Sequence, residues 1–213
     1  MGKIFAVGDI HGCLEKLADL MVKINIDPIH DTLVFIGDYI DRGRDSKGVV
    51  DYIIDLKKTV KTVVCLEGNH ELMFLNYYDY GIDKTLFLDN GGRETLFSYG
   101  DTGFWHKKKL SIPDSHREFF HDLQPYYETD AYIFVHAGLR PGIPLKDQVM
   151  DDMLWIRRDF IDSGYDFGKK VVFGHTPMTE PLIDETKIGI DTGAVYGGKL
   201  TCIRLPDMDI FQV

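Results

Sequence analysis

The sequence has 213 residues, of which 44% are hydrophobic and 12% aromatic, and its formal net charge at pH 7 is −10. This length and composition are typical of one globular domain with a sizeable core. The negative charge argues against non-specific binding to nucleic acid or anionic membranes, because both need a basic surface. It does not exclude an anionic substrate, since a local metal centre can outweigh distant negative charge.

The N-terminal segment MGKIFAVGDIHG leads directly into an apolar strand, with no signal peptide before it. No apolar run of the sequence is long enough to span a membrane. The cysteines Cys13, Cys65 and Cys202 do not have the spacing of a zinc site, and we expect them to be reduced and mostly buried. Together these features predict a cytoplasmic protein without membrane or nucleic-acid partners, and we expect a monomer.

The first third of the chain alternates apolar strands with amphipathic helices. Apolar residues recur at helical spacing in residues 14–24 and 46–58, and Ser46 is placed to cap the second helix. Strands are predicted at 3–8, 32–37 and 62–68, and a further helix begins near His70. This alternation favours an α/β sheet with parallel neighbours.

The stretch from Asp79 to Asp130 differs from the rest. It contains a glycine turn followed by an aromatic helix in DNGGRETLFSYG, and a predicted helix in DSHREFFHDLQPYYE (114–128). Because it is short, we interpret it as a helical cap inserted at about 79–130 into a single domain that spans residues 1–213.

After this insertion the strands resume. They are predicted at 131–138, 170–176, 187–193, 199–205 and 209–213. The last of them are short and closely spaced, which predicts antiparallel pairing. The whole pattern predicts an α/β fold in which two packed sheets, a β-sandwich, are flanked by helices.

One pattern recurs at the strand ends: an apolar strand ends in Gly, and a residue that can bind metal follows. It occurs in AVGDIHG, VFIGDYIDRG, VCLEGNHE, IFVHAG and VVFGHT. In α/β sheets, ligands bind beyond the carboxyl ends of the strands, so these residues should converge on one site. Their oxygen and nitrogen donors suit Mn, Fe or Zn.

The convergent residues are too many for one metal ion but suit two ions that share a bridging carboxylate. Asp38 lies on the middle strand and is the expected bridge. We assign one ion to Asp9, His11 and Asp38, and the other to Asp38, Asn69, His136 and His175. Such a pair supports hydrolysis at phosphorus by a metal-bridging hydroxide, without a Ser or Cys nucleophile.

Three further residues have expected roles in catalysis. His70 follows Asn69 directly, and pairing with Asp41 would orient it as a general acid for the leaving oxygen. Arg42 follows Asp41 and could bind phosphate oxygens in a bidentate way. Asp191, in IDTG, is interpreted as a turn residue, and His30, His106, His116 and His121 receive no role.

The motifs GDIHG, GDYIDRG, GNHE, HAG and GHT, in this order, resemble those of the phosphoprotein phosphatase family of metallophosphoesterases. The resemblance runs from Val7 to about Gly193. It implies a calcineurin-like β-sandwich fold and a dinuclear site that often carries Mn. It also implies the metal ligands given above, His70 as the acid, Asp41 as its partner, and two phosphate-binding arginines. These would be Arg42 and Arg157, with Arg158 as the second choice.

We first expect hydrolysis of phosphoserine and phosphothreonine monoesters, so that the partner is a phosphoprotein or a phosphorylated small molecule. An alternative is a symmetrical dinucleoside polyphosphate hydrolase acting on substrates such as diadenosine tetraphosphate, because the same motifs serve either reaction. A remote alternative is a non-catalytic interaction module with bound metal. The cap must decide the substrate, and the sequence does not show its pocket.

Overall fold

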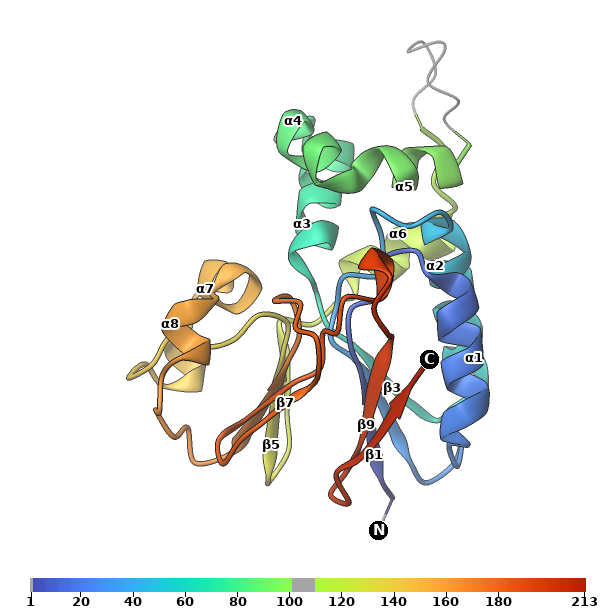
Figure 1. Ribbon diagram of the computed structural model, residues 1–213. Helices are drawn as coiled ribbons and strands as arrows, with labels where there is room; N and C mark the ends of the chain where they lie inside the picture. Colours follow the sequence, from blue (N-terminus) through green and yellow to red (C-terminus); the bar gives the residue numbers. More distant parts are fainter. Residues whose placement is uncertain (1, 101–109) are drawn as a thin grey trace.

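Two five-stranded sheets face each other in the computed structural model, which describes residues 2–100 and 110–213 (Figure 1). The first sheet has the order β10 (Asp209–Gln212), β9 (Thr201–Leu205), β1 (Ile4–Val7), β2 (Thr32–Phe35) and β3 (Thr62–Cys65). The second has the order β4 (Tyr126–Glu128), β5 (Tyr132–Val135), β6 (Lys170–Phe173), β8 (Lys187–Gly189) and β7 (Leu182–Ile183). The predicted two-sheet α/β fold is confirmed.

Each sheet contains three neighbouring parallel strands and also antiparallel pairs. β1 pairs in parallel with β2, and β2 with β3, while β9 runs antiparallel to both β1 and β10. In the second sheet β5, β6 and β8 are parallel, with β4 and β7 antiparallel to their neighbours. The predicted antiparallel pairing of the last strands is therefore correct for β9 and β10, but wrong for β8 beside β6.

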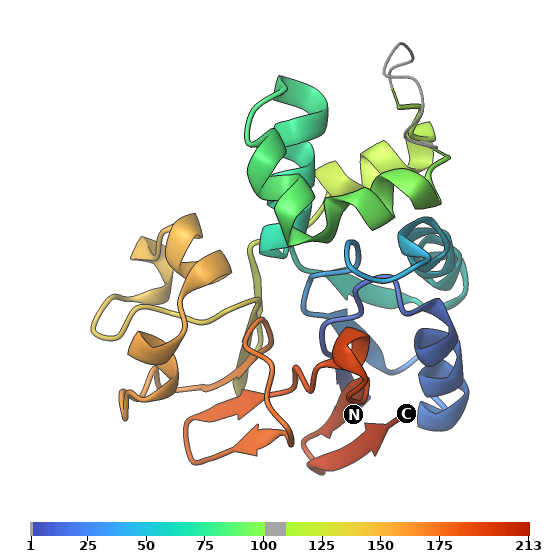
Figure 2. The same ribbon diagram turned by 45° about the horizontal axis from the view of Figure 1, so that its top comes forward.

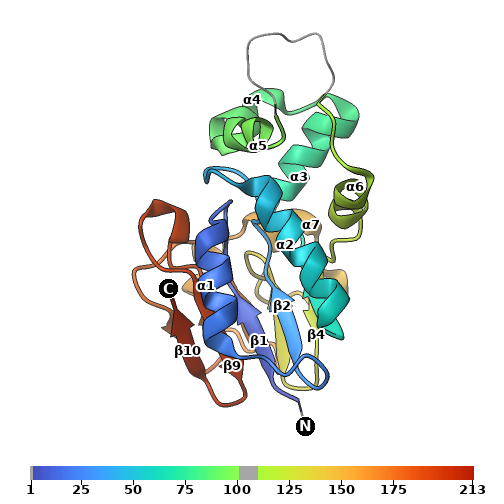
Figure 3. The same ribbon diagram turned by 90° about the vertical axis from the view of Figure 1, so that its right-hand side faces the viewer.

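Side chains alternate between the two faces of the first sheet, as the pleat requires. Ala6, Val34 and Val64 face the second sheet, where Phe134 and Val172 complete a core between the sheets. The opposite face of the first sheet buries its side chains under α1 (Leu14–Ile24) and α2 (Ser46–Thr59) (Figure 3). Helices α7 (Met150–Trp155) and α8 (Arg158–Ile161) cover the outer face of the second sheet (Figure 1).

Local sequence explains where the first two helices begin and end. α1 has the predicted bounds and ends before Asn25, which adopts the left-handed conformation common after helices. α2 begins one residue earlier than a Ser46 cap would require. Its N-cap is Asp45, whose carboxylate accepts a hydrogen bond from the N–H of Gly48 (2.8 Å). Ser46 is instead buried and turned towards the predicted active site.

Several short helices cover the carboxyl ends of the first sheet's parallel strands (Figure 1, Figure 2). They are α3 (Asn69–Leu75), η1 (Asn76–Tyr80), α4 (Lys84–Phe87), η2 (Leu88–Gly92), α5 (Arg93–Ser98) and α6 (Asp114–His121). The aromatic ring of Phe74 packs against Phe87 and Phe120, with centroids 5.8 and 4.9 Å away. The reading of this region as a cap within one domain stays an interpretation, and His106 lies outside the described residues.

One predicted helix in this region is wrong in its second half. The helix expected over 114–128 ends at His121, and Tyr126–Glu128 forms strand β4 beside β5. Pro125 explains the change, because proline lacks an N–H and disrupts a helix interior. The N–H of Gln124 instead donates to the carbonyl of Cys65 at the end of β3 (3.0 Å).

Candidate metal centre

The predicted ligands lie at the carboxyl ends of five strands drawn from both sheets. Loops after β1, β2 and β3 carry those of the first sheet, and loops after β5 and β6 carry those of the second. The two sets meet between the sheets, beneath the helices of the cap (Figure 1). The sequence predicted that the ligands follow adjacent strands of one sheet. In the structure these strands form two groups, one in each sheet.

Five residues predicted for the site have backbones in the left-handed region. They are His11 (φ 46°), Asp38 (54°), Asp41 (71°), Arg42 (67°) and His175 (62°). Non-glycine residues seldom adopt such angles, because each costs on the order of 1–3 kcal/mol and persists only where the surrounding structure imposes it. In these sharply turning loops, the left-handed conformation directs the side chains of the five residues towards one small volume.

Asp38 lies between two groups of potential metal ligands. Its Oδ2 is 3.4 Å from Nε2 of His11 and 3.9 Å from Nε2 of His70. Its Oδ1 is 3.4 Å from Nε2 of His136. The two oxygens of Asp38 therefore face different histidines, which is the arrangement of a bridging carboxylate.

The first group contains His11, Asp38 and His70, whose ligand atoms lie within 4.8 Å of one another. His11 donates its Nδ1–H to the carbonyl of Ile40 (2.7 Å), so its Nε2 carries a lone pair, which accepts a hydrogen bond from Nη1 of Arg42 (2.6 Å). Backbone carbonyls commonly orient metal-binding histidines in this way. Burial lowers the pKa of His11 to about 3, so that its ring is neutral at pH 7.

The second group contains Asp38, His136 and His175. His136 donates its Nδ1–H to the carbonyl of Ile36 (2.8 Å), and burial lowers its pKa. Burial likewise lowers the pKa of His175 to about 2. The Oδ1 of Asn69 lies 3.0 Å from Nε2 of His136 and 2.9 Å from Nδ1 of His175. The structure thus brings all four predicted ligands of this ion together.

Asp9 is set slightly apart from both groups. Its carboxylate accepts a hydrogen bond from the backbone N–H of His175 (3.0 Å to Oδ2). Burial and the charges of Asp191 and Asp38 raise its pKa well above the ordinary value. Asp191 caps a turn by accepting the N–H of Gly193 (2.9 Å), as interpreted from the sequence, but its charge also acts on Asp9.

A cation fits these residues, because electron pairs converge here without protons between them. With Nδ1–H of His136 bonded to a carbonyl, its neutral Nε2 has no proton to offer the Oδ1 of Asn69 or of Asp38. The Nε2 of His175 is buried and has no hydrogen-bond partner among the described residues. Buried acceptors in this state need a positive partner. Carboxylate, amide and imidazole donors suit a divalent transition metal.

Asp41 and His70 form a buried pair next to this centre. His70 Nδ1 lies 2.7 Å from Oδ2 of Asp41, and its ring makes an edge contact with His11, with centroids 4.6 Å apart. The other carboxylate oxygen of Asp41 accepts a hydrogen bond from the hydroxyl of Thr95 (2.6 Å). Ser46 and Thr95 both accept the N–H of Asp41. Thr95, in α5, therefore links the cap to this pair.

Glu71 is a positioning residue that we did not identify from the sequence. It is fully buried, and its two oxygens accept the N–H groups of Asp38 (2.9 Å), Tyr39 (2.9 Å), Ile40 (3.3 Å) and Gly68 (3.1 Å). It holds the loop after β2 in the shape that presents Asp38. The available signal was the spacing GNHE, in which Glu71 follows the helix-capping Gly68 by three residues.

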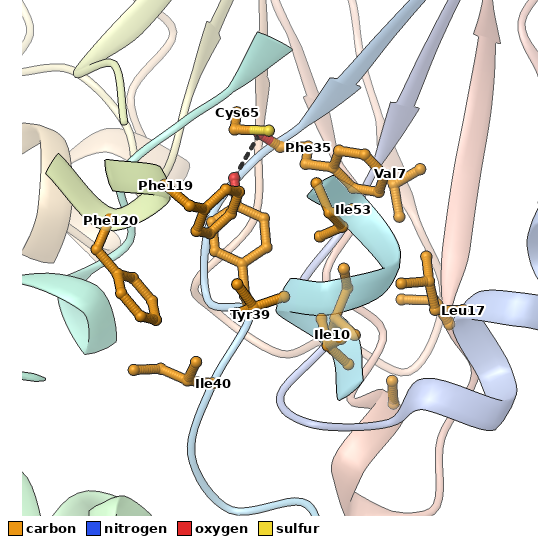
Figure 4. Packing of buried hydrophobic residues seen from close by; sticks show 14 of the residues in the cluster. Val7, Ile10, Leu17, Phe35, Tyr39, Ile40, Ile53, Cys65, Phe119 and Phe120 are labelled. Carbon is orange, nitrogen blue, oxygen red and sulfur yellow. Dashed lines mark hydrogen bonds between the residues drawn. The ribbon is translucent and has the colours of Figure 1, made fainter. Parts of the chain in front are cut away.

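Tyr39 anchors the same loop to the core and to the cap. Its hydroxyl donates to the carbonyl of Leu66 (2.8 Å) and, more weakly, to that of Phe35 (3.4 Å). Its ring packs edge-on against Phe119 of α6, with centroids 5.3 Å apart (Figure 4). Glu71 therefore holds the backbone of this loop, and the side chain of Tyr39 attaches the loop to the core and the cap.

The two candidate phosphate-binding arginines are placed differently. Nη1 of Arg42 donates to Nε2 of His11 (2.6 Å), and its guanidinium lies against the ring of Tyr196. Arg157 and Arg158 are both exposed and line the same cavity beside Trp155. The charge of Arg157 adds to burial in lowering the pKa of His136 and His175, whereas Arg158 pairs with Asp162 (3.4 Å). The choice of Arg157 over Arg158 stays a prediction.

Residues 2–205 match the model of the calcineurin-like phosphoesterase family. This chain belongs to that family. It is therefore a metallophosphoesterase, a hydrolase whose family uses divalent metals, and the fold predicted from the motif resemblance is confirmed.

Relatives within the calcineurin-like phosphoesterases narrow the resemblance further. The chain is 29% identical over 232 aligned residues to a bis(5'-nucleosyl)-tetraphosphatase PrpE (asymmetrical) of Bacillus cereus strain Q1, covering 97% of this chain and 92% of the relative. A protein of the same name from Bacillus thuringiensis subsp. konkukian is 28% identical with the same coverage. These names do not support the protein phosphatase branch specifically.

Solved structures of other proteins have the same fold. A provisionally assigned diadenosine tetraphosphatase has a TM-score of 0.78 and 25% identity, over 100% of this chain and 93% of that one. A cold-active protein-tyrosine phosphatase of a psychrophilic Shewanella species has a TM-score of 0.67 and 18% identity, over 100% and 80%. The second likeness shows the fold alone.

Two further expectations from the sequence concern the whole chain. All three cysteines are free, with Cys65 and Cys202 buried and Cys13 partly exposed. No helix within the described residues is both long and apolar enough to cross a membrane.

Proposed function

We propose that this chain hydrolyses bis(5'-nucleosyl)-tetraphosphates, releasing a nucleoside triphosphate and a nucleoside monophosphate. The similarity to tetraphosphatases over 97% of the chain carries the proposal, because the match extends over the cap as well as over the metal centre. The ligand motifs do not choose between substrates, since phosphomonoester and phosphoanhydride hydrolysis both place water on phosphorus.

The comparisons thus support the dinucleotide alternative better than the phosphoserine and phosphothreonine activity that we expected first. They also change one detail of that alternative. We expected symmetrical cleavage, which would give two nucleoside diphosphates, whereas the relatives are named as asymmetrical enzymes. Unequal products would follow if water attacks the phosphorus next to one nucleoside and the other three phosphates leave together.

Two divalent ions are part of the proposal, with Mn²⁺ expected first and Fe or Zn as alternatives. Asp9, His11 and Asp38 would hold one ion, and Asp38, Asn69, His136 and His175 the other. When bound, such ions supply Lewis-acid activation of water and charge stabilisation at phosphorus.

His70 and Asp41 supply the proton chemistry. With Nδ1–H of His70 directed to Asp41, protonated His70 presents Nε2–H to the centre. The oxygen of water forms the new bond to phosphorus, the bond to the leaving oxygen breaks, and Nε2–H of His70 gives its proton to that oxygen. A proton released from the attacking water restores His70. Arg42 and Arg157 bind phosphate oxygens from the two sides.

The products of Mn²⁺-loaded protein acting on diadenosine tetraphosphate test the proposal. We expect ATP and AMP in equal amounts by chromatography, and kcat/KM well above that for a phosphothreonine peptide. Two ADP per substrate would show symmetrical cleavage, and a strong preference for the peptide would restore the protein phosphatase prediction. Inactivity on both substrates with metal bound would favour the non-catalytic module. A cytoplasmic location and a monomeric state stay predictions from the sequence.

A further inference from the structure

A cavity of about 480 Å³ lies beside the first group of ligands. The loops after β1 and β2 line it through Gly12, Arg42, Gly43 and Arg44. Arg42 connects the cavity to the centre, because its guanidinium also donates to Nε2 of His11. A ligand that occupies this cavity can therefore reach the reacting phosphorus.

The cavity is positive in a protein whose net charge is −10. Lys16, Arg42 and Arg44 supply three positive charges, and Glu15 and Asp45 supply two negative ones. Asp45 is engaged as the N-cap of α2. Arg44 is exposed, and no carboxylate pairs with it within the part of the chain that the structure describes. Arg42 and Arg44 thus carry charge that an anionic ligand can use.

The walls of the cavity are fixed by short-range contacts. Nζ of Lys16 donates to the carbonyls of Ala194 (2.8 Å) and Gly198 (2.5 Å), which joins α1 to the turn around η4 (Ala194–Tyr196). At Gly43 an added Cβ would lie 1.9 Å from the carbonyl oxygen of His11, so the two loops touch backbone to backbone. Such a site is organised before a ligand arrives, which reduces the entropy cost of binding.

A second cavity, of about 340 Å³, lies on the opposite side of the centre and differs in charge. It includes Trp155, whose ring lies 6.1 Å from that of His175. Its three arginines are balanced by three aspartates, and Arg140 is already paired with Asp152. Additional phosphates are therefore favoured in the first cavity rather than in the second.

We infer that the cavity lined by Arg42, Gly43 and Arg44 binds the distal phosphates of the leaving nucleotide. The inference rests on the proposed function, which supplies a substrate with a polyphosphate arm. His70 lies on the same side of the centre, in edge contact with His11, so its proton reaches the leaving oxygen from this cavity's side. A monoester has no second phosphate to fill the cavity, which makes Arg44 a determinant of dinucleotide selectivity.

The test compares diadenosine tetraphosphate with p-nitrophenyl phosphate, a monoester that cannot reach the cavity. For Arg44→Ala we expect the ratio of kcat/KM between these substrates to fall by about 10- to 100-fold, as for a lost charged hydrogen bond to phosphate. Arg44→Glu should lower the ratio further. Arg117→Ala, which removes the same charge from an exposed position on α6, should leave the ratio unchanged.

Calorimetric titration of each protein with ATP and with AMP gives a readout independent of turnover. Arg44→Ala should weaken ATP binding by about 10- to 100-fold and AMP binding much less. An unchanged substrate ratio, or equal weakening of ATP and AMP, would overturn the inference. Wild-type protein that cleaves p-nitrophenyl phosphate but not the dinucleotide would refute the proposed function alone. The ATP titration would then still decide whether the cavity binds polyphosphate.

Discussion

The two sheets contribute unequally to the centre. Loops of the first sheet supply Asp9 and Asp38, the Asp41–His70 pair and Arg42, whereas loops of the second supply the imidazoles of His136 and His175. The first half also carries the contacts to the cap, through Thr95 and Tyr39. In the proposed mechanism, proton transfer and leaving-group binding therefore depend on the first sheet, while the second sheet mainly completes the set of proposed metal ligands.

Asp38 joins the two halves, so its replacement is expected to have the largest effect. In Asp38→Asn, one charged oxygen of the bridge is lost, and both ions should bind more weakly. We expect metal content below two ions per chain by mass spectrometry, and a fall in kcat/KM of at least about 10³-fold. Asp31→Asn is a matched control, since Asp31 is a buried carboxylate that accepts the N–H groups of Lys3 and Asp27. Two tightly bound ions in Asp38→Asn would contradict the bridging role.

His70 belongs to the first half alone, which allows metal binding and catalysis to be separated. We expect His70→Asn to keep its metal content while turnover of phenyl phosphate, which has a poor leaving group, falls by about 10²–10⁴-fold. The loss on diadenosine tetraphosphate should be smaller, because a polyphosphate leaves without much help from an acid. His30→Asn, at a largely exposed position, is the control. Equal activity of wild type and His70→Asn on phenyl phosphate would remove His70 from the mechanism.

Asp191 lies where the two halves of the centre meet, and replacing it should have the smallest effect of the three substitutions. Burial raises its pKa to about 6, above the ordinary value of 3.8, so the folded protein binds this proton more tightly than the unfolded chain. The associated stability is present below pH 3.8 and is lost as the pH rises through 6. In metal-free protein, Asp191→Asn should therefore raise the free energy of unfolding by about 1–3 kcal/mol at pH 7.5 and not at pH 4.

Urea unfolding in the presence of a chelator measures this difference. Asp184→Asn should have the opposite sign, because hydrogen bonds from Thr186 and Lys187 lower the pKa of Asp184 and its charge stabilises the fold. If Asp191→Asn instead lowered the free energy of unfolding at pH 7.5, the prediction that the charge of Asp191 is unfavourable beside Asp9 would be wrong.

Much of the fold was predictable from the sequence, as was the convergence of the proposed metal ligands, because both depend on local patterns. Apolar runs that end in Gly predict where strands end. The residue after each Gly predicts which side chain lies at that strand end. Glu71 and Thr95 were not identified, because their importance depends on hydrogen bonds to a loop far away in the sequence. Ser46 was interpreted as a helix cap, whereas its hydroxyl accepts the N–H of Asp41. Strand β4 was missed because the aromatic pattern around Tyr126 was read as helix in spite of Pro125.

The substrate was the least predictable property. In the proposed mechanism, Asp38, His70 and Arg42 act on phosphorus and its oxygens, which phosphoproteins and dinucleotides share. The features that could distinguish them, such as the charge balance of the cavity at Arg44, arise from loops that come together only in the folded chain.

The position of β1 has a consequence for the order of folding during synthesis. Among the described strands of the two sheets, β1 is made first, yet one of its edges pairs with β9, so that Ile4 lies opposite Leu205. Because the ribosome releases the N-terminal part first, that edge of β1 has no partner strand until nearly the whole sequence shown here has emerged. An unpaired strand edge is prone to join other chains. The interval between synthesis of β1 and of β9 is therefore the period in which a nascent chain most needs protection from aggregation.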